Sequence, residues 1–333
     1  MKTIKHIFAV DSHTMGEPTR IIIGGIGPIP GATIVGKRQF LIDNFDHIRT
    51  ALMHEPRGHC NMFGAIILEP TNPKADLGIV FMDCGGYLNM CGHGSIGVVT
   101  VALEMGILEQ EAPITKVTLD TPGGLVYARA EIENGTVKSV TIQNVPSFIF
   151  RETLPIEVPR IGTIPIDIAF GGNFCALVAA SDLGLELEPA NMFKLIEMGS
   201  LILQSVNKIV VSHPTKSHIQ TIDLVKIYGP TKSAKADEKN IVVFGHGQFD
   251  RSPCGTGTCA RMAALFSKGK LKLGQEFINE SIIGTTFSGR LIDETIVGNI
   301  KAVIPEITAR AFITGIQQFV IDPADPLRYG FSI

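Results

Sequence analysis

The sequence predicts a mixed α/β protein in which one arrangement of strands and helices occurs twice. Short strand patterns alternate with a few helical patterns along the chain. Two helical segments, at 95–106 and 258–267, are apolar on nearly every face, which is typical of helices that other structure encloses. A Cys-Gly-x-Gly motif occurs at the start of each segment, and the two motifs lie about half a chain length apart. These observations indicate a duplicated fold.

The first part of the chain is expected to contain several strands and two helices. One helix is expected over 37–54, because apolar residues recur there at helical spacing until Pro56 ends the pattern. The other is the apolar helix at 95–106. Asn134-Gly135 separates two alternating segments, which is a strong signal for a hairpin turn. The expected strands are 4–10, 19–23, 65–68, 77–82, 117–119, 125–132 and 137–142.

The rest of the chain repeats this order of elements. A helix is expected from Pro189, a residue type favoured at the first helical position, to about Asn207. The apolar helix at 258–267 follows it, as the helix at 95–106 follows the first helix. The strands in this part are expected at 166–170, 176–179, 221–227 and 241–244.

The repeat extends to individual residues. Residues 91–108 align with 254–271 without gaps, which indicates two copies of one structural unit, each with a cysteine where a glycine-rich helix begins. We therefore expect two equivalent thiols in the folded protein. The matched pairs are Cys91/Cys254, Gly92/Gly255, Gly94/Gly257, Gly106/Gly269 and Leu108/Leu271.

Two domains are expected from this duplication. The first is expected to span residues 1–125 and to carry Cys91. The second is expected to span residues 126–304 and to carry Cys254. The C-terminal segment from about 305 to 333 is a candidate to return to the first domain.

Composition excludes several classes of protein. The chain has 333 residues, 45% hydrophobic and 18% charged, which is typical of a compact globular protein. A net charge of −3 without Lys/Arg runs argues against a nucleic-acid partner, so the expected ligand is a small molecule.

Neither export nor a membrane span is expected. The apolar run before Asp11 is too short for a signal peptide, and the segment 95–108 is about half a membrane span and contains Glu104. Six cysteines without a C-x-x-C pair indicate free thiols in a reducing cytoplasm, and no membrane contact is expected.

Cys91 and Cys254 are the candidate reactive residues. Each precedes a helix, so unsatisfied N–H groups and the positive end of the helix dipole should lie beside the sulfur and lower the pKa of the thiol. The same N–H groups can bind a carboxylate. The other four cysteines are expected to be small buried hydrophobic residues. They are Cys60, Cys84, Cys175 and Cys259.

Nucleotide binding is the competing interpretation of the first motif. Gly92, Gly94 and Gly97 match the dinucleotide fingerprint, and Asp120 follows at a suitable distance. However, a Rossmann turn follows its strand directly, whereas a long polar segment separates the expected strand at 77–82 from Gly92. The residues before the second motif are also not expected to form a strand. We therefore expect no dinucleotide site.

A metal site is also not expected. Cys91 and His93, like His59 and Cys60, are too close in sequence for ordinary ligand spacings. No pattern singles out a lysine that would form a Schiff base with pyridoxal phosphate. No cofactor is therefore expected.

Two facing thiols would support proton transfer at a carbon atom next to a carboxylate. One thiolate could remove the α-proton while the other thiol donates a proton to the opposite face, which inverts the stereocentre. Backbone N–H groups that hold the carboxylate would stabilise the carbanion-like transition state. The pattern therefore favours racemisation or epimerisation.

The motifs resemble those of a known family. MDCGGYLNMCGHGSIG (82–97) and DRSPCGTGTCA (250–260) are similar to the two motifs of the proline racemase family. That family includes proline racemases, 4-hydroxyproline epimerases and trans-3-hydroxyproline dehydratases. The resemblance covers essentially the whole chain, because further segments match in family order. They are DSHTMGEPTR (11–20), EPRGHCNMFG (55–64), FGGNF (170–174), DLVKIYG (223–229) and ITARAFITG (307–315).

The resemblance implies a fold and a set of site residues. The fold is that of diaminopimelate epimerase: two similar domains, each a strand-rich barrel around a central helix, with the active site in the cleft between them. The family is commonly dimeric, which implies a homodimer. By resemblance, Cys91 and Cys254 are the acid/base residues, and Asp250 meets the ring nitrogen of the substrate. The carboxylate-binding amides belong to Gly92, His93, Gly255 and Thr256, and the substrate ring lies between Phe63 and Phe244.

The same residues indicate which activity and which substrate of the family to expect. By resemblance, the dehydratases carry threonine where Cys254 stands, so two cysteines favour an isomerase. Against the apolar rings of Phe63 and Phe244, a hydroxyl group would lose water hydrogen bonds at a cost of about 1–3 kcal/mol, which favours proline over hydroxyproline. The alternatives are a 4-hydroxyproline 2-epimerase, then a trans-3-hydroxyproline dehydratase. A protein of another class, a thiol-based redox or ligand-binding protein, also remains open.

Two further cysteines, Cys84 and Cys259, lie close in sequence to the candidate thiols. Cys84 stands where many family members have glycine, and the sequence assigns it no role. Cys259 lies a little over one helical turn after Cys254, so we expect it to pack in the core rather than to react.

Overall fold

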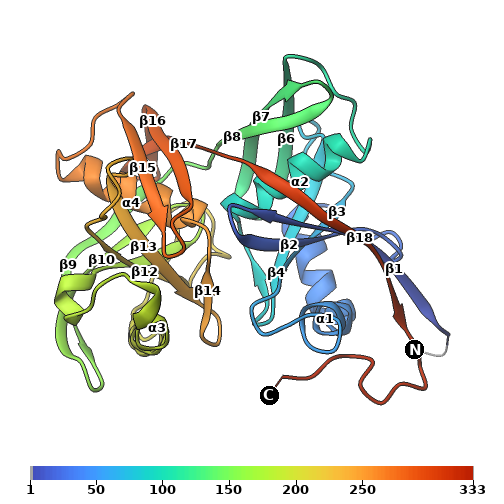
Figure 1. The fold of residues 1–333 in the computed structure, drawn as a ribbon, viewed down its shortest axis with the longest axis horizontal. Coiled ribbons are helices and arrows are strands. Elements are labelled where there is room, and N and C mark those ends of the chain that lie inside the picture. The colour runs from blue at the N-terminus through green and yellow to red at the C-terminus, as the bar shows by residue number, and fades with distance from the viewer. Residues whose placement is uncertain (1–2, 333) are drawn as a thin grey trace. The chain divides into compact units, whose positions relative to one another are not determined.

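The computed structural model describes residues 3–332, which fold into two compact units (Figure 1). The first unit runs to Thr141 and includes the C-terminal segment from Arg310, and the second unit comprises Ile142–Ala309. Within the described residues there are 18 strands and four α-helices. In this part of the chain, no helix is both long and apolar enough to span a membrane.

Eight strands of the first unit surround one helix. β18 pairs with β1, β1 with β2, and β3 with β4, all antiparallel, whereas β2 and β3 run parallel. Figure 1 shows β18, drawn in red, beside the blue β1. Strand β4 also pairs in parallel with β6, which forms a hairpin with β7. The strands are β1 (Lys5–Thr14), β2 (Glu17–Gly24), β3 (Phe63–Leu68), β4 (Leu77–Asp83), β5 (Tyr87–Leu88), β6 (Ile114–Thr121), β7 (Gly124–Glu133) and β18 (Ala311–Ile321).

The enclosed helix of this unit is α2 (Gly92–Glu104). Every residue from Gly92 to Leu103 is buried, and the helix contacts β1, β2, β3, β7 and β18. The second helix, α1 (Ile34–Met53), packs against β4 with one apolar face. Its first turn is capped by Thr33, whose hydroxyl accepts a hydrogen bond from Gly36 N at 3.0 Å.

The second unit has the same order of elements and the same pairing pattern. β11 and β12 run parallel, as β2 and β3 do, and β13 pairs in parallel with β15, as β4 does with β6. The strands are β9 (Phe148–Val158), β10 (Gly162–Phe170), β11 (Phe174–Ala179), β12 (Ile222–Gly229), β13 (Glu238–Phe244), β14 (Gln248–Asp250), β15 (Glu276–Ser281), β16 (Thr286–Val297) and β17 (Ile300–Ala309). Strand β8 (Thr136–Gln143) spans the boundary between the units.

The enclosed helix of the second unit is α4 (Gly255–Ser267). It contacts β9, β10, β11, β16 and β17, and its residues from Gly255 to Ala264 are buried. Helix α3 (Met192–Val206) lies against β12 and β13. A methyl group at Gly199 would lie 2.6 Å from Val243 Cγ2, so this glycine permits the close approach of helix and sheet. Both units thus repeat one arrangement of strands around a central helix.

The expected domain limits differ from the observed units. The first unit extends to Thr141 rather than ending at residue 125, because β7 pairs with β6 along its length. The returning segment starts at Arg310 rather than near residue 305, because β17 pairs with β16 as far as Thr308. The hairpin turn was expected correctly: Asn134 and Gly135 both have positive φ, as a two-residue turn of this type requires.

Several elements were missed or displaced. No strand was expected at β9, at β14 before the second motif, or in the region of β15–β18. Isoleucines such as Ile296 and Ile316 are exposed on these strands, so the alternation of polar and apolar residues is blurred. Pro189 begins a short 3₁₀ turn and α3 starts at Met192. The two enclosed helices each start three residues earlier than expected, because glycines, which are poor helix formers, occupy their first turns.

Candidate active site

Cys91 is the N-cap of α2. Its backbone is extended, with φ −144° and ψ 126°, and its Sγ accepts a hydrogen bond from Gly94 N at 3.2 Å. Its carbonyl oxygen accepts from both the amide and the hydroxyl of Ser95, at 3.1 and 2.6 Å. The residue is 6% exposed. The sulfur therefore lies against the first turn of an enclosed helix, as the sequence predicts.

The His93 ring lies directly on this sulfur. Its Nδ1 is 3.2 Å from Cys91 Sγ, and Phe63 packs edge-on against the ring with centroids 4.5 Å apart. The carbonyl oxygen of His93 accepts a hydrogen bond from Thr14 Oγ1 at 2.8 Å. From the sequence, His93 was expected to act through its backbone N–H, with its ring supporting the motif, but no contact of the ring with the sulfur was expected. The contact depends on the rotamer of a buried side chain, which the motif alone does not show.

The glycines of the first motif serve packing. A methyl group at Gly94 would lie 2.9 Å from the ring of Phe81 and 3.2 Å from Cys91 Sγ. At Gly97, it would lie 3.1 Å from Ser12 Oγ on β1. Glycine therefore lets the helix approach the surrounding strands closely. The enclosure of α2 by strands accounts for the G-x-G-x-x-G pattern without a dinucleotide.

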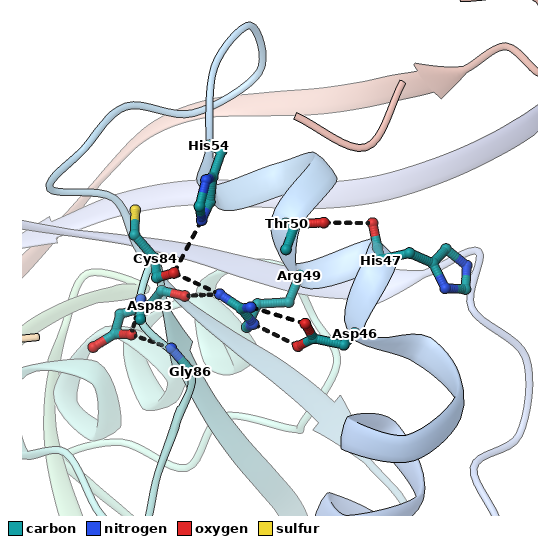
Figure 2. A network of polar contacts seen from close by, with 9 residues as sticks. Asp46, His47, Arg49, Thr50, His54, Asp83, Cys84 and Gly86 are labelled. Carbon is teal, nitrogen blue, oxygen red and sulfur yellow. Dashed lines mark hydrogen bonds and ion pairs between the residues drawn. The ribbon is translucent and has the colours of Figure 1, made fainter. Parts of the chain in front are cut away.

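A polar network anchors the loop that leads to Cys91 (Figure 2). Asp83 Oδ1 accepts hydrogen bonds from the amides of Gly85 and Gly86, both at 2.7 Å. Arg49 donates to the carbonyl oxygens of Asp83 and Cys84, at 2.9 and 2.7 Å. Asp46 holds the Arg49 guanidinium with two hydrogen bonds of 2.6 and 2.9 Å. Helix α1 thus fixes the loop that leads to Cys91.

Cys84 belongs to this structural network. Its Sγ is 3.2 Å from the carbonyl oxygen of His59 and 3.4 Å from that of Met53, and its single S–H can donate to either of them. Burial, assisted by the nearby charge of Asp83, raises the pKa of the Cys84 thiol to about 11. Cys84 therefore remains a neutral donor at physiological pH and ties the loop to the segment after α1.

The remaining cysteines divide by exposure. Cys175 and Cys259 are fully buried, and burial raises the pKa of each thiol to about 12. Both therefore behave as small core residues, as expected. Cys60 is exposed, so the expectation of a buried Cys60 is wrong. It lies in the Gly/Pro-containing loop between α1 and β3, where the backbone runs over the surface.

Cys254 is the N-cap of α4, with a different backbone. Its φ of 63° and ψ of 108° are unusual for a residue other than glycine and indicate local strain. Ser252 Oγ accepts a hydrogen bond from Cys254 N at 3.1 Å. Asn279 Nδ2 donates to the carbonyl oxygen of Pro253 and to Thr258 Oγ1, at 3.0 and 2.7 Å. These buried contacts hold the strained turn in place.

The Cys254 thiol is protonated in this environment. Burial, followed by the negative charge of Asp250, raises the pKa of the thiol well above its usual range. The charge of Lys226 and the hydrogen bond from Gly257 N, 3.4 Å from Sγ, act in the opposite direction. The expected lowering by the helix N-terminus is therefore present but is outweighed by burial. This corrects the prediction of a lowered pKa at Cys254.

The other predicted residues of the second motif lie close to Cys254. Thr256 Oγ1 is 3.7 Å from the sulfur, and Asp250 Oδ1 accepts a hydrogen bond from Ser252 N at 2.8 Å. Phe244 belongs to the same buried apolar cluster as Cys254. Gly255 and Thr256 form the first turn of α4, whose amides make no hydrogen bonds within the helix. The predicted residues therefore gather around each thiol within its own unit.

The surroundings of Cys91 and of Cys254, one thiol site in each unit, have the same local arrangement. In each, a buried cysteine caps an enclosed helix, its sulfur accepts from the amide three residues later, and the side chain two residues later approaches the sulfur. This arrangement offers a thiol for proton transfer beside amides that can bind an anion. Within residues 3–332, no three His, Cys, Asp or Glu side chains cluster as a metal site would require. The fold and these two thiol sites define a class of duplicated α/β proteins with one thiol site in each unit.

Comparison with known proteins gives the family. The profile described as proline racemase matches residues 9–332. The proline racemase of Acetoanaerobium sticklandii is 53% identical, and the 4-hydroxyproline 2-epimerase of Streptosporangium roseum is 45% identical, with 100% of both chains covered in each case. A hydroxyproline epimerase from Agrobacterium vitis, with bound trans-4-hydroxy-L-proline, has a TM-score of 0.94 at 35% identity, covering 100% of this chain and 97% of the other. The chain belongs to the proline racemase family, and the predicted fold class is confirmed.

Proposed function

We propose that the protein is a proline racemase that interconverts L- and D-proline without a cofactor. The observation that carries this proposal is the pair of capping thiols in a chain that is 53% identical to a proline racemase over its whole length. The apolar rings of Phe63 and Phe244, one beside each thiol site, support a plain pyrrolidine ring as the substrate.

The mechanism uses the two thiols as acid and base. The thiolate of Cys91 removes the α-proton, and the thiol of Cys254 donates a proton to the opposite face of the same α-carbon. The raised pKa of Cys254 supports its role as the donor in this direction. In the reverse reaction, the roles exchange. The mechanism requires both thiols to reach one substrate molecule.

Backbone amides and Asp250 orient the substrate. The first-turn amides of Gly92 and His93, with those of Gly255 and Thr256, bind the carboxylate and stabilise the charge that develops when the α-proton leaves. Asp250 is buried and binds the protonated ring nitrogen. A cleft that closes over the substrate would strengthen these contacts by excluding water.

The experiment that tests the function is racemisation in heavy water. The reduced protein, incubated with L-proline without cofactor or metal, is expected to bring the optical rotation to zero and to incorporate deuterium at the α-carbon. A thiol-based redox or ligand-binding protein would bind proline under reducing conditions without this exchange. Unchanged rotation and no deuterium would exclude proline as a substrate.

The second candidate is a 4-hydroxyproline 2-epimerase. It is favoured by the identity of 45% to such an enzyme and by the similarity to the epimerase structure with bound trans-4-hydroxy-L-proline. Comparing kcat/KM for L-proline and trans-4-hydroxy-L-proline on the same preparation separates the two functions. We expect proline to be preferred by about 5- to 150-fold, since the hydroxyl group would lose about 1–3 kcal/mol of hydration against the two phenylalanines. Dehydration of trans-3-hydroxyproline is the least favoured activity, because it needs no second thiol.

Cys259→Ser is expected to leave racemisation within about threefold of wild type, because this thiol packs in the core and stays protonated. The thermal midpoint is expected to fall, since an additional hydroxyl group is buried. Initial rates of optical rotation and a thermal melt check both statements. A loss as large as that of Cys254→Ser would contradict the assignment of the two acid/base residues.

We further propose that the enzyme is a cytoplasmic homodimer. All six cysteines are free, which suits a reducing compartment, and the family resemblance implies a dimer. Light scattering coupled to gel filtration measures the oligomeric state. A mass near 35.9 kDa would indicate a monomer and contradict the dimer.

A further inference from the structure

Lys226 is a buried lysine without a hydrogen-bond partner. It lies in the middle of β12 and is 0% exposed. Its Nζ makes no hydrogen bond to any residue within 3–332. A buried ammonium group without a partner is costly, so a protein that keeps one needs a compensating reason.

The position of Lys226 places its side chain beneath α4. In a strand, alternate residues share a face, so Lys226 is on the same side of β12 as Leu224. Its cross-strand neighbours are Leu177 on β11 and Val242 on β13. These three apolar residues belong to the buried cluster that contains Cys254. A methyl group at Gly257, in the first turn of α4, would lie 3.3 Å from Val242, so the helix start covers this face closely.

The charged groups around Lys226 leave Cys254 as its anionic partner. Glu238 on β13 is already held by Arg261 of α4, with three hydrogen bonds between 2.7 and 3.1 Å. Cys175 on β11 is a neutral thiol, because burial raises its pKa to about 12. Asp250 on β14 accepts a hydrogen bond from the turn before Cys254. In the proposed mechanism, the protonated ring nitrogen of the substrate balances the charge of Asp250. The thiolate of Cys254, once formed, is then the negative charge left for the Lys226 ammonium to balance.

Comparison of corresponding positions in the two units shows which basic side chain lies near each thiol. Gly94 packs on Phe81 in the first unit, as Gly257 packs on Val242 in the second. Phe81 pairs with Ala65, whereas Val242 pairs with Lys226, so Ala65 stands at the position that corresponds to Lys226. Conversely, the residue two positions after the cysteine is His93 in the first unit and Thr256 in the second. Each thiol therefore has one basic side chain near it, supplied from a different position of the repeat.

We propose that Lys226 is a positioning residue whose buried ammonium stabilises the thiolate of Cys254, the counterpart of the His93 ring at Cys91. This inference rests on the proposed racemase function. When Cys254 donates to the substrate, its S–H bond breaks, the proton forms the new C–H bond, and the electron pair stays on sulfur. Lys226 gives up no proton in this step and balances the new negative charge.

The pKa of the lysine is consistent with this role. Burial lowers the pKa of Lys226 to about 8, whereas the charges of Glu238 and Cys254 raise it. The amine is therefore mostly protonated near pH 7 and loses its charge over the next two pH units. The stabilisation of the thiolate should fade over the same interval.

The test compares wild type with Lys226→Met, which keeps the length of the side chain and removes the charge. The rate of iodoacetamide alkylation of Cys254 is measured between pH 7 and 9 by mass spectrometry of the labelled peptide, because the thiolate is the reacting form. At pH 7, we expect at least about a tenfold slower reaction at Cys254 in the variant, and less than about a twofold change at Cys91. In the variant, the alkylation rate of Cys254 should rise tenfold for each pH unit. In wild type near pH 8, the rate should rise by less than tenfold per pH unit, because Lys226 loses its charge there.

Two further readouts separate this role from a structural one. The thermal midpoint of Lys226→Met is expected to equal or exceed that of wild type, because a costly buried charge is removed. If the protein racemises proline, kcat/KM should fall at least about tenfold and equally in both directions, because the two enantiomers have the same free energy. Lys239→Met is the matched control, since Lys239 lies on β13 and pairs with Glu280 at 3.5 Å. It should leave the alkylation of Cys254 unchanged.

An unchanged alkylation profile of Cys254 in folded Lys226→Met would overturn the proposal. Lys226→Leu is made in parallel, so that a folded neutral variant is available if the methionine variant misfolds. If both neutral variants lose their fold, Lys226 is a structural residue and the proposal is also wrong. Alkylation does not depend on turnover, so an inactive wild-type protein would contradict the racemase function without deciding the role of Lys226.

Discussion

Replacing either Cys91 or Cys254 by serine is expected to reduce kcat/KM for proline racemisation by about 10²- to 10⁴-fold, the usual contribution of a general acid or base. Serine keeps the size of the side chain and its capacity to accept from the amide of Gly94 or Gly257. Its hydroxyl group, however, ionises at far higher pH than a thiol. Both directions of the reaction should be affected equally, because the two enantiomers have the same free energy.

Polarimetry and α-deuterium incorporation measure this loss. Cys259→Ser is the matched control, because it makes the same change in α4 at a thiol that only packs in the core. Thermal melts of all three variants show whether the fold is retained. If a folded Cys91→Ser or Cys254→Ser variant kept more than about a tenth of the wild-type rate, general acid–base catalysis by that thiol would be contradicted.

Asp250→Asn is expected to lower racemisation and to increase the reactivity of Cys254 at the same time. The variant loses the charged hydrogen bond to the substrate ring nitrogen, worth about 1.5–3 kcal/mol, or about 10- to 100-fold in kcat/KM. The negative charge of Asp250 raises the pKa of Cys254, so its removal lowers that pKa and increases the fraction of thiolate. Asparagine keeps the oxygen that accepts from Ser252 N.

Kinetics and thiol alkylation on the same sample check both parts of this prediction. Unfolding would also expose the buried Cys254 thiol and speed its alkylation, so a thermal melt of Asp250→Asn must show that the fold is retained. Asp237→Asn is a control at another carboxylate of the second unit, because Asp237 likewise accepts a hydrogen bond from a backbone amide, that of Ile278. Unchanged turnover in Asp250→Asn would exclude a role of this carboxylate in substrate binding.

The sequence was sufficient to locate the two cysteines that cap the enclosed helices. A cysteine before a glycine-rich apolar segment predicts a capping thiol, because the glycine pattern and the uniform burial of such a helix are local properties. Cys91 and Cys254 both occupy that position in the structure. The repeat of this motif also predicted the duplication, because the same local pattern occurs twice.

The sequence was less informative about the strands and the unit boundary. Strand β18 pairs with β1, from the opposite end of the chain, and a contact between such distant segments leaves no local pattern. The long strands β16 and β18 carry exposed isoleucines, so their polar face is not evident from the alternation of residues. The limits of the first unit depended on the pairing of β6 with β7, which is also a tertiary property.

The amino-acid sequence by itself determined the family, the duplicated fold class and the two thiols, because these depend on residue types at fixed local spacings. Only the tertiary structure decided the protonation of the Cys254 thiol and the basic side chain beside each thiol. Burial raises the pKa of Cys254 against the helix dipole, the His93 ring meets Cys91, and the unpaired Lys226 lies on the sheet face beneath α4. Dielectric environment and charge proximity arise from residues far apart in the chain, so they exist only once the chain has folded.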